Sequence, residues 1–522
     1  MADEERWSLP TGSYNAAVDL VDRHLDLGRA EQAAFVDPVR RLTYGALHDR
    51  TARFGGALHR LGVRREQRIV LILLDTVDFP VAFWGAIRAG IVAVPLNTLL
   101  TPDQWHFMVE DSRAAAVVVS PELLDRARPV LDRIRRERPL HLVVTGSEAP
   151  PDGLALEALL ADAPPAPPAD THADEIAFWL YTSGSTGQPK GARHVHGSPA
   201  ATAELYGRRV LGIEAGDVVF SAAKLFFAYG LGNGMSFPLR VGATAILLPD
   251  RPTPEAVLAT IRAHQPTIFC GVPTLYAGLL ATGVEPGAGS ARLRSCISAG
   301  EALPDDIGRR WRDAVGVDVL DGIGSTEMLH IFLSNRPGLV RYGSSGKPVP
   351  GYEARIIDEH GHLAAPGEIG ELVVKGPSAA EGYWNQRDRS RRTFAGEWTH
   401  TGDKYRVDED GYFHYCGRTD DMFKVSGIWV SPFEVESALV SHPAVLEAAV
   451  VGKEDVDGLV KPKAFVVLRA GAVADETLFE SLRVHVKTVA GPWKYPRWID
   501  VRAELPKTAT GKIQRFKLRE DG

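Results

Sequence analysis

The chain has 522 residues, of which 45% are hydrophobic and 24% charged, and its formal net charge is −7. This composition is typical of a globular protein that is long enough to build more than one hydrophobic core. The negative charge argues against a broad nucleic-acid-binding surface. No apolar run approaches the ~20 residues of a membrane-spanning helix, so neither nucleic acid nor a membrane is an expected partner.

The first residues of the sequence and its cysteines bear on the cellular compartment of the protein. The first residues, MADEERWSLPTG, are acidic and polar and do not resemble a signal or transit peptide. Cys270, Cys296 and Cys416 lie far apart, which predicts reduced thiols and a cytoplasmic protein. His194 and His196 have a spacing that can serve a metal ion. With no third ligand nearby, an ordinary strand or turn is favoured.

The first third of the chain alternates strand-like and helix-like patterns. Residues 68–74 (RIVLILL), 91–97 and 114–120 are compact β-branched runs, and residues 78–90 between the first two have helical spacing and a terminal glycine. Near-continuous apolar strands separated by helices predict a parallel sheet covered on both faces. The Pro- and Ala-rich residues 149–169 are expected to form a surface connection within one domain.

Residues 181–191, YTSGSTGQPKG, directly follow the apolar run IAFWL. Glycines that allow close backbone approach, hydroxyl groups and the single Lys190 are the groups that surround a polyphosphate. A flexible surface turn is the alternative, but this stretch is denser in such residues than a chance turn. The pattern GxxxxGK[ST] is absent, which disfavours a P-loop kinase or ATPase.

The last hundred residues have a different texture. A hairpin-like piece and a charged turn lead into a helix, and two short strands (AVLEAAVVG and KPKAFVVL), another helix and a basic tail follow. This pattern predicts a small α+β domain. The expected protein is therefore α/β, with a large domain of parallel and mixed sheets layered by helices over residues 1–419 and a mobile C-terminal lid over residues 420–522.

Six ordered motifs point to a known family: YTSGSTGQPKG, SAGEALP (298–304), DGIGSTEM (321–328), HTGD (400–403), GRTDDMFKVSG (417–427) and PKTATGKIQR (506–515). Together they resemble the acyl-adenylate-forming enzymes, the superfamily of acyl-CoA synthetases, luciferases and peptide-synthetase adenylation domains. The resemblance covers essentially the whole chain. Within the superfamily, AAKLFFAYGLGNG and GIGSTEMLHIFLSN are most similar to benzoate-CoA ligases.

The resemblance implies a reaction in two halves, with ATP and coenzyme A as co-substrates and Mg²⁺ as cofactor. A small aromatic carboxylate attacks the α-phosphate of ATP to give acyl-AMP and pyrophosphate, and the thiol of coenzyme A then displaces AMP. Benzoic acid, with a pKa of about 4, is already ionised at neutral pH, so the first half needs no general base. It needs charge neutralisation and alignment instead.

The resemblance assigns the chemistry of the first half to two residues. Lys512 is expected to bridge the acid and the α-phosphate, although composition alone would favour a solvated lysine in a basic tail. Glu327 is expected to hold Mg²⁺ between phosphates, since one carboxylate suffices for that ion. The alternative for Glu327 is a charge at a helix N-terminus, with Ser325 or Thr326 capping the segment EMLHIFL.

The nucleotide contacts implied by the resemblance fall into three groups. Thr326 and the glycine-rich segment meet the phosphates; the segment's residues are Thr182, Ser183, Gly184, Ser185, Thr186, Gly187 and Lys190. Asp403 accepts hydrogen bonds from the ribose hydroxyls, with Arg418 assisting. The residues that match those enclosing adenine are Gly300, Glu301, Asp321, Gly322 and Ile323. Any one of these carboxylates taken alone is more often a turn residue.

The second half-reaction implies a moving domain. Asp420 matches the hinge of the family, about which the small domain would swing to exchange Lys512 for the loop that carries Lys424, Ser426 and Gly427. The alternative for the segment TDD is a solvated linker, which a hinge must also be. Trp429 stands where the family often has Tyr, and a minor packing change is expected there.

By the same resemblance the acid lies between FFAYGLG and GSTEMLHIF. The expected wall residues are Phe227, Ala228, Tyr229, Gly324, His330 and Ile331, with His330 meeting the carboxylate. Aromatic residues in a helical segment are more often core, which is the alternative. Bulky Phe227 and Ile331 argue against a long acyl tunnel. Acceptance of a para-hydroxyl group stays open, because a site without a placed partner discriminates weakly against one.

The leading hypothesis is an aryl acid-CoA ligase for benzoate or a close derivative, with a 4-hydroxybenzoate-CoA ligase as the alternative. An aryl-acid adenylating enzyme that loads a carrier protein is a rival, although no carrier domain follows the final REDG. An inactive regulatory relative is disfavoured because Lys512, Glu327 and Asp403 are all present. Nothing supports a luciferase-like enzyme. A homodimer is left open, and Lys512 is a hypothetical acetylation site.

Overall fold

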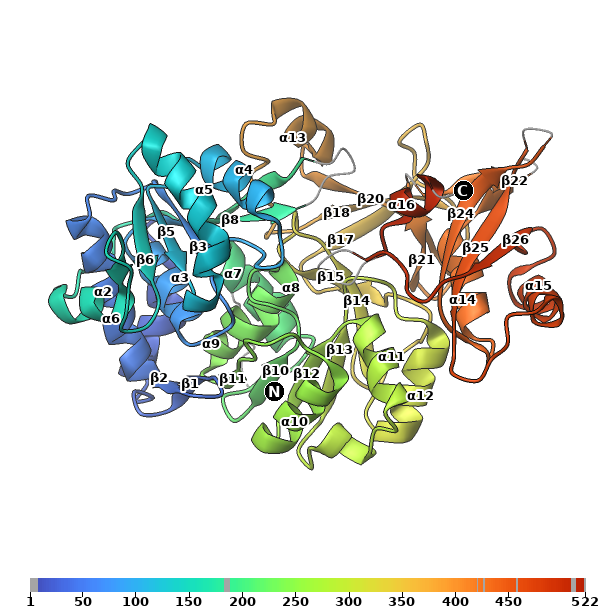
Figure 1. Cartoon of the computed structure of the whole chain (residues 1–522), viewed down its shortest axis with the longest axis horizontal. Coiled ribbons are helices and arrows are strands. Elements are labelled where there is room, and N and C mark those ends of the chain that lie inside the picture. Colours follow the sequence, from blue (N-terminus) through green and yellow to red (C-terminus); the bar gives the residue numbers. More distant parts are fainter. Residues whose placement is uncertain are drawn as a thin grey trace.

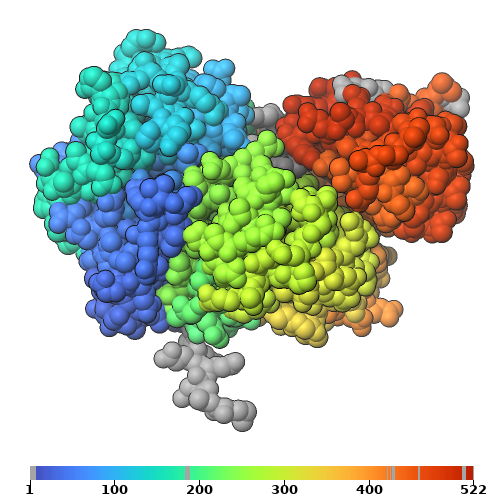
Figure 2. All heavy atoms as spheres, turned by 60° about the horizontal axis from the view of Figure 1, so that its bottom comes forward, coloured from blue at the N-terminus to red at the C-terminus, as the bar shows by residue number. Residues whose placement is uncertain are grey.

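The protein is described here by a computed structural model that covers residues 8–182, 188–419, 421–425, 428–456, 459–507 and 513–520. A larger part carries three β-sheets flanked by helices, and a smaller C-terminal part carries a two-stranded and a three-stranded sheet (Figure 1). Figure 2 shows the orange and red C-terminal residues as a separate mass at one side of the molecule. This architecture confirms the predicted α/β class with a small α+β domain.

The first sheet has seven strands in the order β7-β6-β5-β3-β4-β8-β9. All neighbours are parallel except β8 and β9, which pair antiparallel. The strands are β3 (Arg68–Ile72), β4 (Val92–Pro95), β5 (Ala116–Val119), β6 (His141–Val144), β7 (Leu154–Ala155), β8 (Ile176–Thr182) and β9 (Lys190–Val195). The helices of this region are α2 (Tyr44–Arg60), α3 (Asp78–Arg88), α4 (Pro102–Asp111), η2 (Pro121–Leu123), α5 (Leu124–Glu137) and α6 (Leu156–Asp162).

Two helices of this region show how the sequence sets local structure. Every residue of α3 is buried, and a helix that is apolar on all sides belongs in the interior. α4 begins at a capping box, in which the Thr101 hydroxyl accepts the Gln104 N–H and the Gln104 side chain accepts the Thr101 N–H. Pro102 at the first position of the helix adds to this start signal.

The second sheet has nine strands in the order β16-β15-β14-β13-β12-β10-β11-β1-β2. Its central strands are parallel, and the antiparallel ones lie at the edges. The strands are β1 (Ala33–Val36), β2 (Arg41–Thr43), β10 (Val218–Ser221), β11 (Thr244–Ile246), β12 (Ile268–Gly271), β13 (Ser295–Ser298), β14 (Val319–Gly324), β15 (Ile331–Ser334) and β16 (Lys347–Pro348).

Short helices connect or flank these strands. They are η1 (Val18–Asp22), α1 (Arg23–Asp26), α7 (Gly197–Thr202), η3 (Ala203–Arg208), α8 (Ala228–Leu231), η4 (Gly232–Ser236), α9 (Phe237–Val241), α10 (Pro254–His264), α11 (Pro273–Ala281), η5 (Pro286–Gly289) and α12 (Asp305–Val315). The segments η1, η3 and η4 are π-helical. Such turns are rare and often occur near functional sites.

The third sheet is antiparallel and joins the large part to the C-terminal part. Its strands are β17 (Glu353–Ile357), β18 (Gly370–Lys375), β19 (Phe394–Ala395), β20 (Trp398–Val407) and β21 (Phe413–Arg418), and helix α13 (Arg387–Thr393) precedes β19. Beyond it come the hairpin β22 (Phe423–Val425) and β23 (Ile428–Val430), and the sheet β24 (Val445–Glu454), β25 (Val460–Leu468) and β26 (Trp498–Val501). The C-terminal helices are α14 (Pro432–Val440), α15 (Glu476–Ala490) and α16 (Arg515–Glu520).

The strands and helix predicted within residues 68–120 are all present, with ends that differ by at most two residues. Residues 149–169, predicted to be a surface connection, also contain regular structure. They contain β7, which extends the first sheet, and α6, whose Leu156 and Leu160 are buried. The abundance of Pro and Ala hid this amphipathic turn of helix.

Other expectations concern metals, thiols and membranes. Cys270, Cys296 and Cys416 are buried free thiols. Among the described residues, no group of three or more His, Cys, Asp or Glu could hold a metal ion. His196 Nδ1 accepts the Ala16 N–H at 3.1 Å, so it is structural. No helix in the described part of the chain is both long and apolar enough to span a bilayer.

Candidate active site

Several predicted nucleotide-binding residues meet at the carboxyl ends of neighbouring parallel strands, the usual place for a ligand in an open α/β sheet. Gly300 and Glu301 follow β13, and β14 itself carries Asp321, Gly322 and Ile323. Gly300 has φ +97°, a conformation that side-chain-bearing residues rarely adopt, so glycine lets the chain turn directly after β13. The sheet therefore brings together the segments expected around adenine.

A cluster of charge lies beside this edge, where Lys190, Glu327 and Tyr383 converge from three distant parts of the chain. The Tyr383 hydroxyl donates to Glu327 Oε1 at 2.6 Å. Lys190 Nζ lies 3.3 Å from that hydroxyl and 4.0 Å from Glu327 Oε1. The same ammonium sits 4.4 Å from the centre of the Tyr383 ring. Burial lowers the pKa of Lys190, and the Glu327 carboxylate opposes that shift. A cation and a carboxylate are thus held together next to the glycine-rich segment.

Two hydrogen bonds to backbone carbonyls hold the turn that carries Thr326 and Glu327. His194 Nε2 bonds the Thr326 carbonyl at 2.9 Å, and the Ala380 N–H donates to the Glu327 carbonyl at 2.8 Å. Burial lowers the pKa of His194 to about 4, so at neutral pH the ring is uncharged and Nε2 is the donor. His194, one of the two histidines with a spacing that can serve a metal ion, therefore supports the backbone at Thr326.

The alternative that Glu327 marks the start of a helix is wrong. Ser325 Oγ accepts the Met328 N–H at 3.2 Å, as a cap would, but no helix follows. The chain makes a tight turn and enters β15, which pairs antiparallel with β14. An apolar run of this length fits a strand as well as a helix, and the partner strand decides between them.

Asp403 and Arg418 face each other on adjacent strands. They are register partners in β20 and β21, and Arg418 Nη1 lies 2.9 Å from Asp403 Oδ1. Arg418 Nη1 also donates to the Thr401 carbonyl at 3.0 Å, while Thr401 Oγ1 accepts the Asp403 N–H at 3.1 Å. The two side chains predicted to act together on the ribose are therefore neighbours, and their role there stays a prediction.

Asp321 is the most deeply placed carboxylate of the predicted set. It is buried, and its Oδ2 accepts the Leu303 N–H at 3.3 Å. Burial raises the pKa of this carboxyl well above its usual value. The Asp321 carbonyl accepts both the backbone and side-chain N–H of Asn335, which fixes the strand end.

The predicted acyl-pocket residues also come together. Ala228 and Tyr229 begin α8, Phe227 precedes it, and the Tyr229 hydroxyl donates to the carbonyls of Gly271 and Ile297, at 3.1 Å each. The His330 ring lies 5.7 Å from the Tyr229 ring, and its Nε2 is 3.3 Å from the Tyr229 carbonyl. Two further wall residues, Gly324 and Ile331, are register partners in β14 and β15.

The residues predicted to line the acyl pocket include both half-buried and buried members. Phe227, Ala228 and Tyr229 are half-buried, whereas His330 and Ile331 are buried. Ile331 packs in a core cluster with Phe332 and Leu333. Ile331 therefore fits the alternative of an ordinary core residue, whereas the half-buried residues at the start of α8 fit it less well.

Several predicted residues lie outside the described part of the chain: Ser183, Gly184, Ser185, Thr186, Gly187, Asp420, Ser426, Gly427 and Lys512. Their flanking backbones are placed. Thr182 pairs with Lys190 across β8 and β9, Lys424 pairs with Trp429 across β22 and β23, and Lys507 bridges to Ile513. The glycine-rich segment and the loop after Lys424 therefore start and end on paired strands, and the segment that carries Lys512 is flanked by an isolated bridge.

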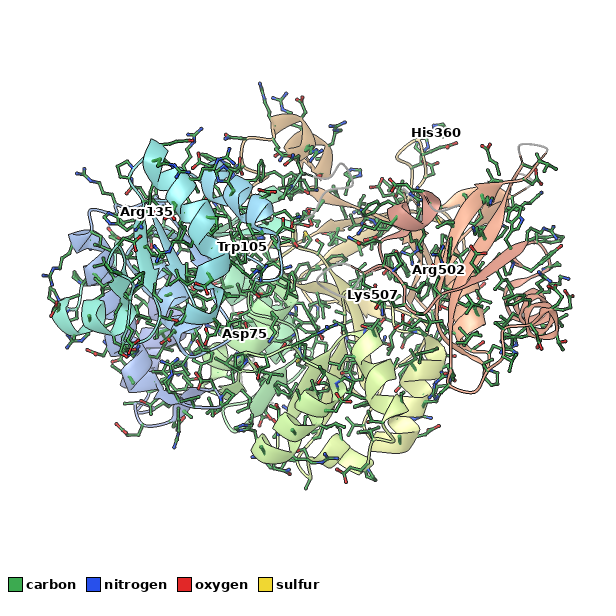
Figure 3. All side chains as sticks on the ribbon, viewed as in Figure 1. Asp75, Trp105, Arg135, His360, Arg502 and Lys507 are labelled. Carbon is green, nitrogen blue, oxygen red and sulfur yellow. The ribbon has the colours of Figure 1, made fainter. Side chains whose placement is uncertain are left out.

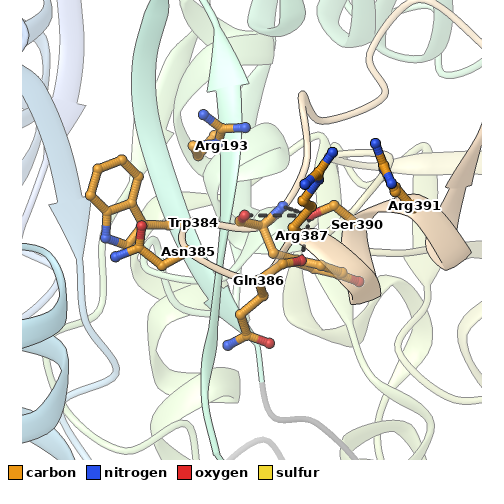
Figure 4. Close-up of a pocket in the computed structure, with 8 residues that line it drawn as sticks. Arg193, Trp384, Asn385, Gln386, Arg387, Ser390 and Arg391 are labelled. Atoms are coloured by element: carbon orange, nitrogen blue, oxygen red, sulfur yellow. Dashed lines mark hydrogen bonds between the residues drawn. The ribbon is translucent and has the colours of Figure 1, made fainter.

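Tyr383 is the member of the site that the sequence prediction missed. The segment EGYW gave no chemical signal, because its contact with Lys190 joins residues 193 positions apart. On its outer side, Tyr383 also lines an open cleft of about 420 Å³ (Figure 4). The residues lining the cleft are Arg193, Tyr383, Trp384, Asn385, Gln386, Arg387, Ser390 and Arg391, which include three arginines and no carboxylate.

Comparison with known proteins identifies the family of this chain. The family model described as AMP-binding enzyme matches residues 25–384, and the model of the AMP-binding enzyme C-terminal domain matches residues 434–512. A 4-hydroxybenzoate–CoA/benzoate–CoA ligase of Rhodopseudomonas palustris is 55% identical over 98% of this chain and 95% of its own length. A benzoate–CoA ligase of Thauera aromatica is 57% identical over 97% of this chain and 96% of its own length.

A solved structure shares the same arrangement. The crystal structure of a benzoate CoA ligase from Burkholderia xenovorans LB400 superposes with a TM-score of 0.90 at 51% identity, covering 97% of this chain and all of that one. The two family models match successive parts of one chain, and the relatives match nearly its full length. The protein therefore belongs to the family of AMP-binding, acyl-adenylate-forming enzymes.

Proposed function

We propose that this chain is an ATP-dependent aryl acid–CoA ligase that converts benzoate or a close derivative to its coenzyme A thioester. The observation that carries the proposal is the near-full-length identity of 55% and 57% to two enzymes whose names both include benzoate–CoA ligase. The cluster of Lys190, Glu327 and Tyr383 supports it, together with the aromatic side chains of Tyr229 and His330, because adenylation brings an aryl carboxylate to a polyphosphate.

In the first half-reaction the acid's carboxylate attacks the α-phosphate, the bond to the β-phosphate breaks, and pyrophosphate leaves. Lys190 would meet the phosphates, and Lys512 would bridge the two reacting anions, which fits their basic character. The ribose hydroxyls would donate to Asp403, and Arg418 keeps that carboxylate oriented at 2.9 Å. Gly300, Glu301, Asp321, Gly322 and Ile323 would enclose the adenine.

Glu327 suits a magnesium ion that also touches phosphate oxygens. Its side chain is 16% exposed, and within the described residues its hydrogen bond is made through Oε1 alone. Magnesium usually takes one or two carboxylates together with substrate phosphates. When bound, the ion would neutralise charge on the phosphates, while Tyr383 orients the carboxylate that holds it.

His330 would serve as a wall of the acyl pocket. Burial lowers its pKa to about 3, so the ring is neutral at pH 7. Its Nε2 faces the Tyr229 carbonyl and is therefore the protonated nitrogen, which leaves Nδ1 as an acceptor. An acceptor repels a carboxylate. The expected contact of His330 with the acid thus becomes ring packing, and Lys512 remains the cation for the carboxylate.

The second half-reaction would need the small domain, residues 420–522, to turn about Asp420 relative to residues 1–419. The Thr419 N–H donates to the Gly402 carbonyl at 2.9 Å on one side. On the other side Asp421 pairs with Arg515 and Arg519 of the small domain. Each side of the turn is thus held by a different part of the molecule, which fits a hinge. Turning would bring Lys424, Ser426 and Gly427 to the acyl-AMP.

A homodimer and a cytoplasmic location stay predictions from the sequence. The alternative function, loading of a carrier protein, differs from the proposal in the acceptor thiol alone. Pyrophosphate release would be measured over benzoate, 4-hydroxybenzoate, 2-aminobenzoate, cinnamate, hexanoate and acetate, with and without coenzyme A. Turnover with benzoate that requires coenzyme A supports the ligase. Adenylation without coenzyme A turnover supports the carrier, and inactivity with every aryl acid contradicts the pocket assignment.

A further inference from the structure

The loop that leads from β10 into α8 carries the first wall residue of the acyl pocket, and it is anchored by a buried carboxylate from the other sheet. Asp75 follows β3, is 3% exposed, and lies between the blue first part of the chain and the green region around α8 (Figure 3). The Leu225 N–H donates to both oxygens of Asp75, at 3.3 Å each. This contact joins residues 150 positions apart.

The neighbouring residue anchors the same loop in the opposite direction. Lys224 Nζ donates to the carbonyls of Leu248, Pro249 and Asp250, the last at 2.7 Å. Those carbonyls follow β11 in the second sheet. Asp75 and Lys224 also attract one another. The loop is therefore held between the ends of β3 and β11, one from each sheet.

Close packing transmits the position of this loop to the pocket wall. The Phe227 N–H donates to the Lys224 carbonyl at 3.0 Å. A Cβ added to Gly230 would lie 2.1 Å from the Lys224 carbonyl oxygen and 2.5 Å from that of Ala223. Helix α8 thus rests directly on the loop, and any shift of Lys224 or Leu225 must move the residues at its start.

We propose that Asp75 and Lys224 are positioning residues that hold the wall formed by residues 227–229 against the ring of the bound acid and so restrict its ring substituents. This inference rests on the proposed function, since it needs an aryl acid in that pocket. Neither residue is assigned to the reacting atoms.

A purely stabilising role explains the pair less well. Burying charged groups is costly, and a buried ion pair is often no more stabilising than apolar residues of the same size. Burial raises the pKa of Asp75 to about 6 and lowers that of Lys224. At neutral pH the Asp75 carboxyl is thus charged at a desolvation cost, and burial also disfavours the charged form of Lys224. The hydrogen bonds of these two groups fix the position of the loop, because directed hydrogen bonds define geometry where apolar contacts do not.

The test uses three variants and a matched control in the full-length protein. Asp75→Ala removes the acceptor of the Leu225 N–H, Asp75→Asn keeps an acceptor without the charge, and Lys224→Met removes the bonds to β11. The control is Asp217→Asn, at a carboxylate that is 6% exposed, pairs with Arg294 and precedes β10 at the end away from the pocket. Steady-state pyrophosphate release would be measured with benzoate, 4-methylbenzoate and varied ATP.

Displacement of a binding wall by about 1 Å can cost up to about a hundredfold in rate, so we expect Asp75→Ala to lower kcat/KM for benzoate roughly ten- to hundredfold. Lys224→Met should change it in the same direction, and Asp75→Asn by no more than about threefold, because its amide oxygen still accepts. KM for ATP should stay within about twofold of the wild type throughout. The preference for benzoate over 4-methylbenzoate should fall at least fivefold in Asp75→Ala and Lys224→Met.

The control separates positioning from stability. Asp217→Asn should lower the melting temperature while leaving the benzoate to 4-methylbenzoate ratio unchanged. Asp75→Ala or Lys224→Met with the wild-type ratio overturns the proposal, as does an equal loss for ATP and the acid. If Asp75→Ala fails to fold, Lys224→Met decides by the same ratio, and Asp75→Asn should keep a ratio near that of the wild type. A wild-type protein inactive on benzoate refutes the proposed function instead, before any variant is compared.

Discussion

Removing the Tyr383 hydroxyl tests whether the cluster beside the glycine-rich segment works on the nucleotide. Tyr383→Phe deletes one atom that donates to Glu327 Oε1 at 2.6 Å. The ring stays, and with it the contact to Lys190 at 4.4 Å and the packing against Phe394 at 5.5 Å. The substitution therefore removes the hydroxyl's hydrogen bonds to Glu327 and to Lys190 while it keeps the shape of the site.

The size of the effect follows from the surroundings of that bond. A hydrogen bond to a charged group contributes about 1.5–3 kcal/mol. The Glu327 side chain is 16% exposed, so water can partly replace the lost donor and the lower end applies. At about 1.4 kcal/mol per factor of ten, kcat/KM for Mg·ATP should fall roughly tenfold. The KM for benzoate should change little, since Tyr383 does not line the acyl pocket.

The assay is pyrophosphate release at saturating benzoate with ATP and Mg²⁺ varied independently. Tyr44→Phe is the matched control, because its buried hydroxyl donates to the Ala243 carbonyl at 2.7 Å, far from the site. It should lower stability without altering kcat/KM for ATP. The reasoning is refuted if both variants behave alike in ATP dependence, or if Tyr383→Phe weakens benzoate more than ATP.

Three further predictions follow. In Gly232→Ala, the new Cβ would lie 2.3 Å from His330 Cδ2. Displacing that ring should cost about 1–3 kcal/mol of stability, which thermal melts would show. It should also lower kcat/KM for benzoate more than for ATP. A melting temperature and kcat/KM values equal to those of the wild type would contradict the pocket assignment. The free energy of unfolding should fall in acid, because four buried histidines are neutral in the folded protein. Burial lowers their pKa values to about 3 or 4; they are His24, His194, His196 and His330. Since the unfolded pKa is about 6.5, their stabilisation is present above that pH and is lost as pH falls toward 4, by about 1.3 kcal/mol per histidine between pH 7.5 and 5.5. Urea titrations at the two pH values measure this, and equal midpoints would contradict it. Lys512→Ala should slow adenylation at least ~10²-fold yet still convert supplied benzoyl-AMP to thioester. An acetyl-lysine mimic there that releases pyrophosphate at the normal rate would exclude acetylation as a switch.

Local patterns predicted the elements whose signals are local. The β-branched run that became β3, the helical spacing of α3 and the strands β4 and β5 all appear where expected, because each reflects burial on a regular period. The Pro- and Ala-rich residues 149–169 conceal β7 and α6, whose apolar periodicity spans too few residues to stand out. The antiparallel sheet of β17 to β21 was not predicted as a sheet, since its pairings are set by tertiary contacts.

The site divides in the same way. Lys190, Glu327, Asp403 and Arg418 were predicted from motifs, and the structure places Lys190 with Glu327 and Asp403 with Arg418. Tyr383 could not be predicted, because only the folded chain brings its hydroxyl to Glu327. The same holds for Asp75 and Lys224. Asp75 carries no motif, and its partner Leu225 lies in the loop that follows β10 of the other sheet. Supporting residues of this kind emerge from geometry alone.

The most direct test of the central claim is a single-turnover experiment with excess enzyme, labelled benzoate, ATP and Mg²⁺. The acid-quenched products would be identified by mass spectrometry before and after coenzyme A is added. We predict that benzoyl-AMP accumulates with one equivalent of pyrophosphate and then disappears as benzoyl-CoA and AMP form together. Benzoyl-CoA formed without a preceding adenylate, or an adenylate that coenzyme A leaves untouched, would contradict the account.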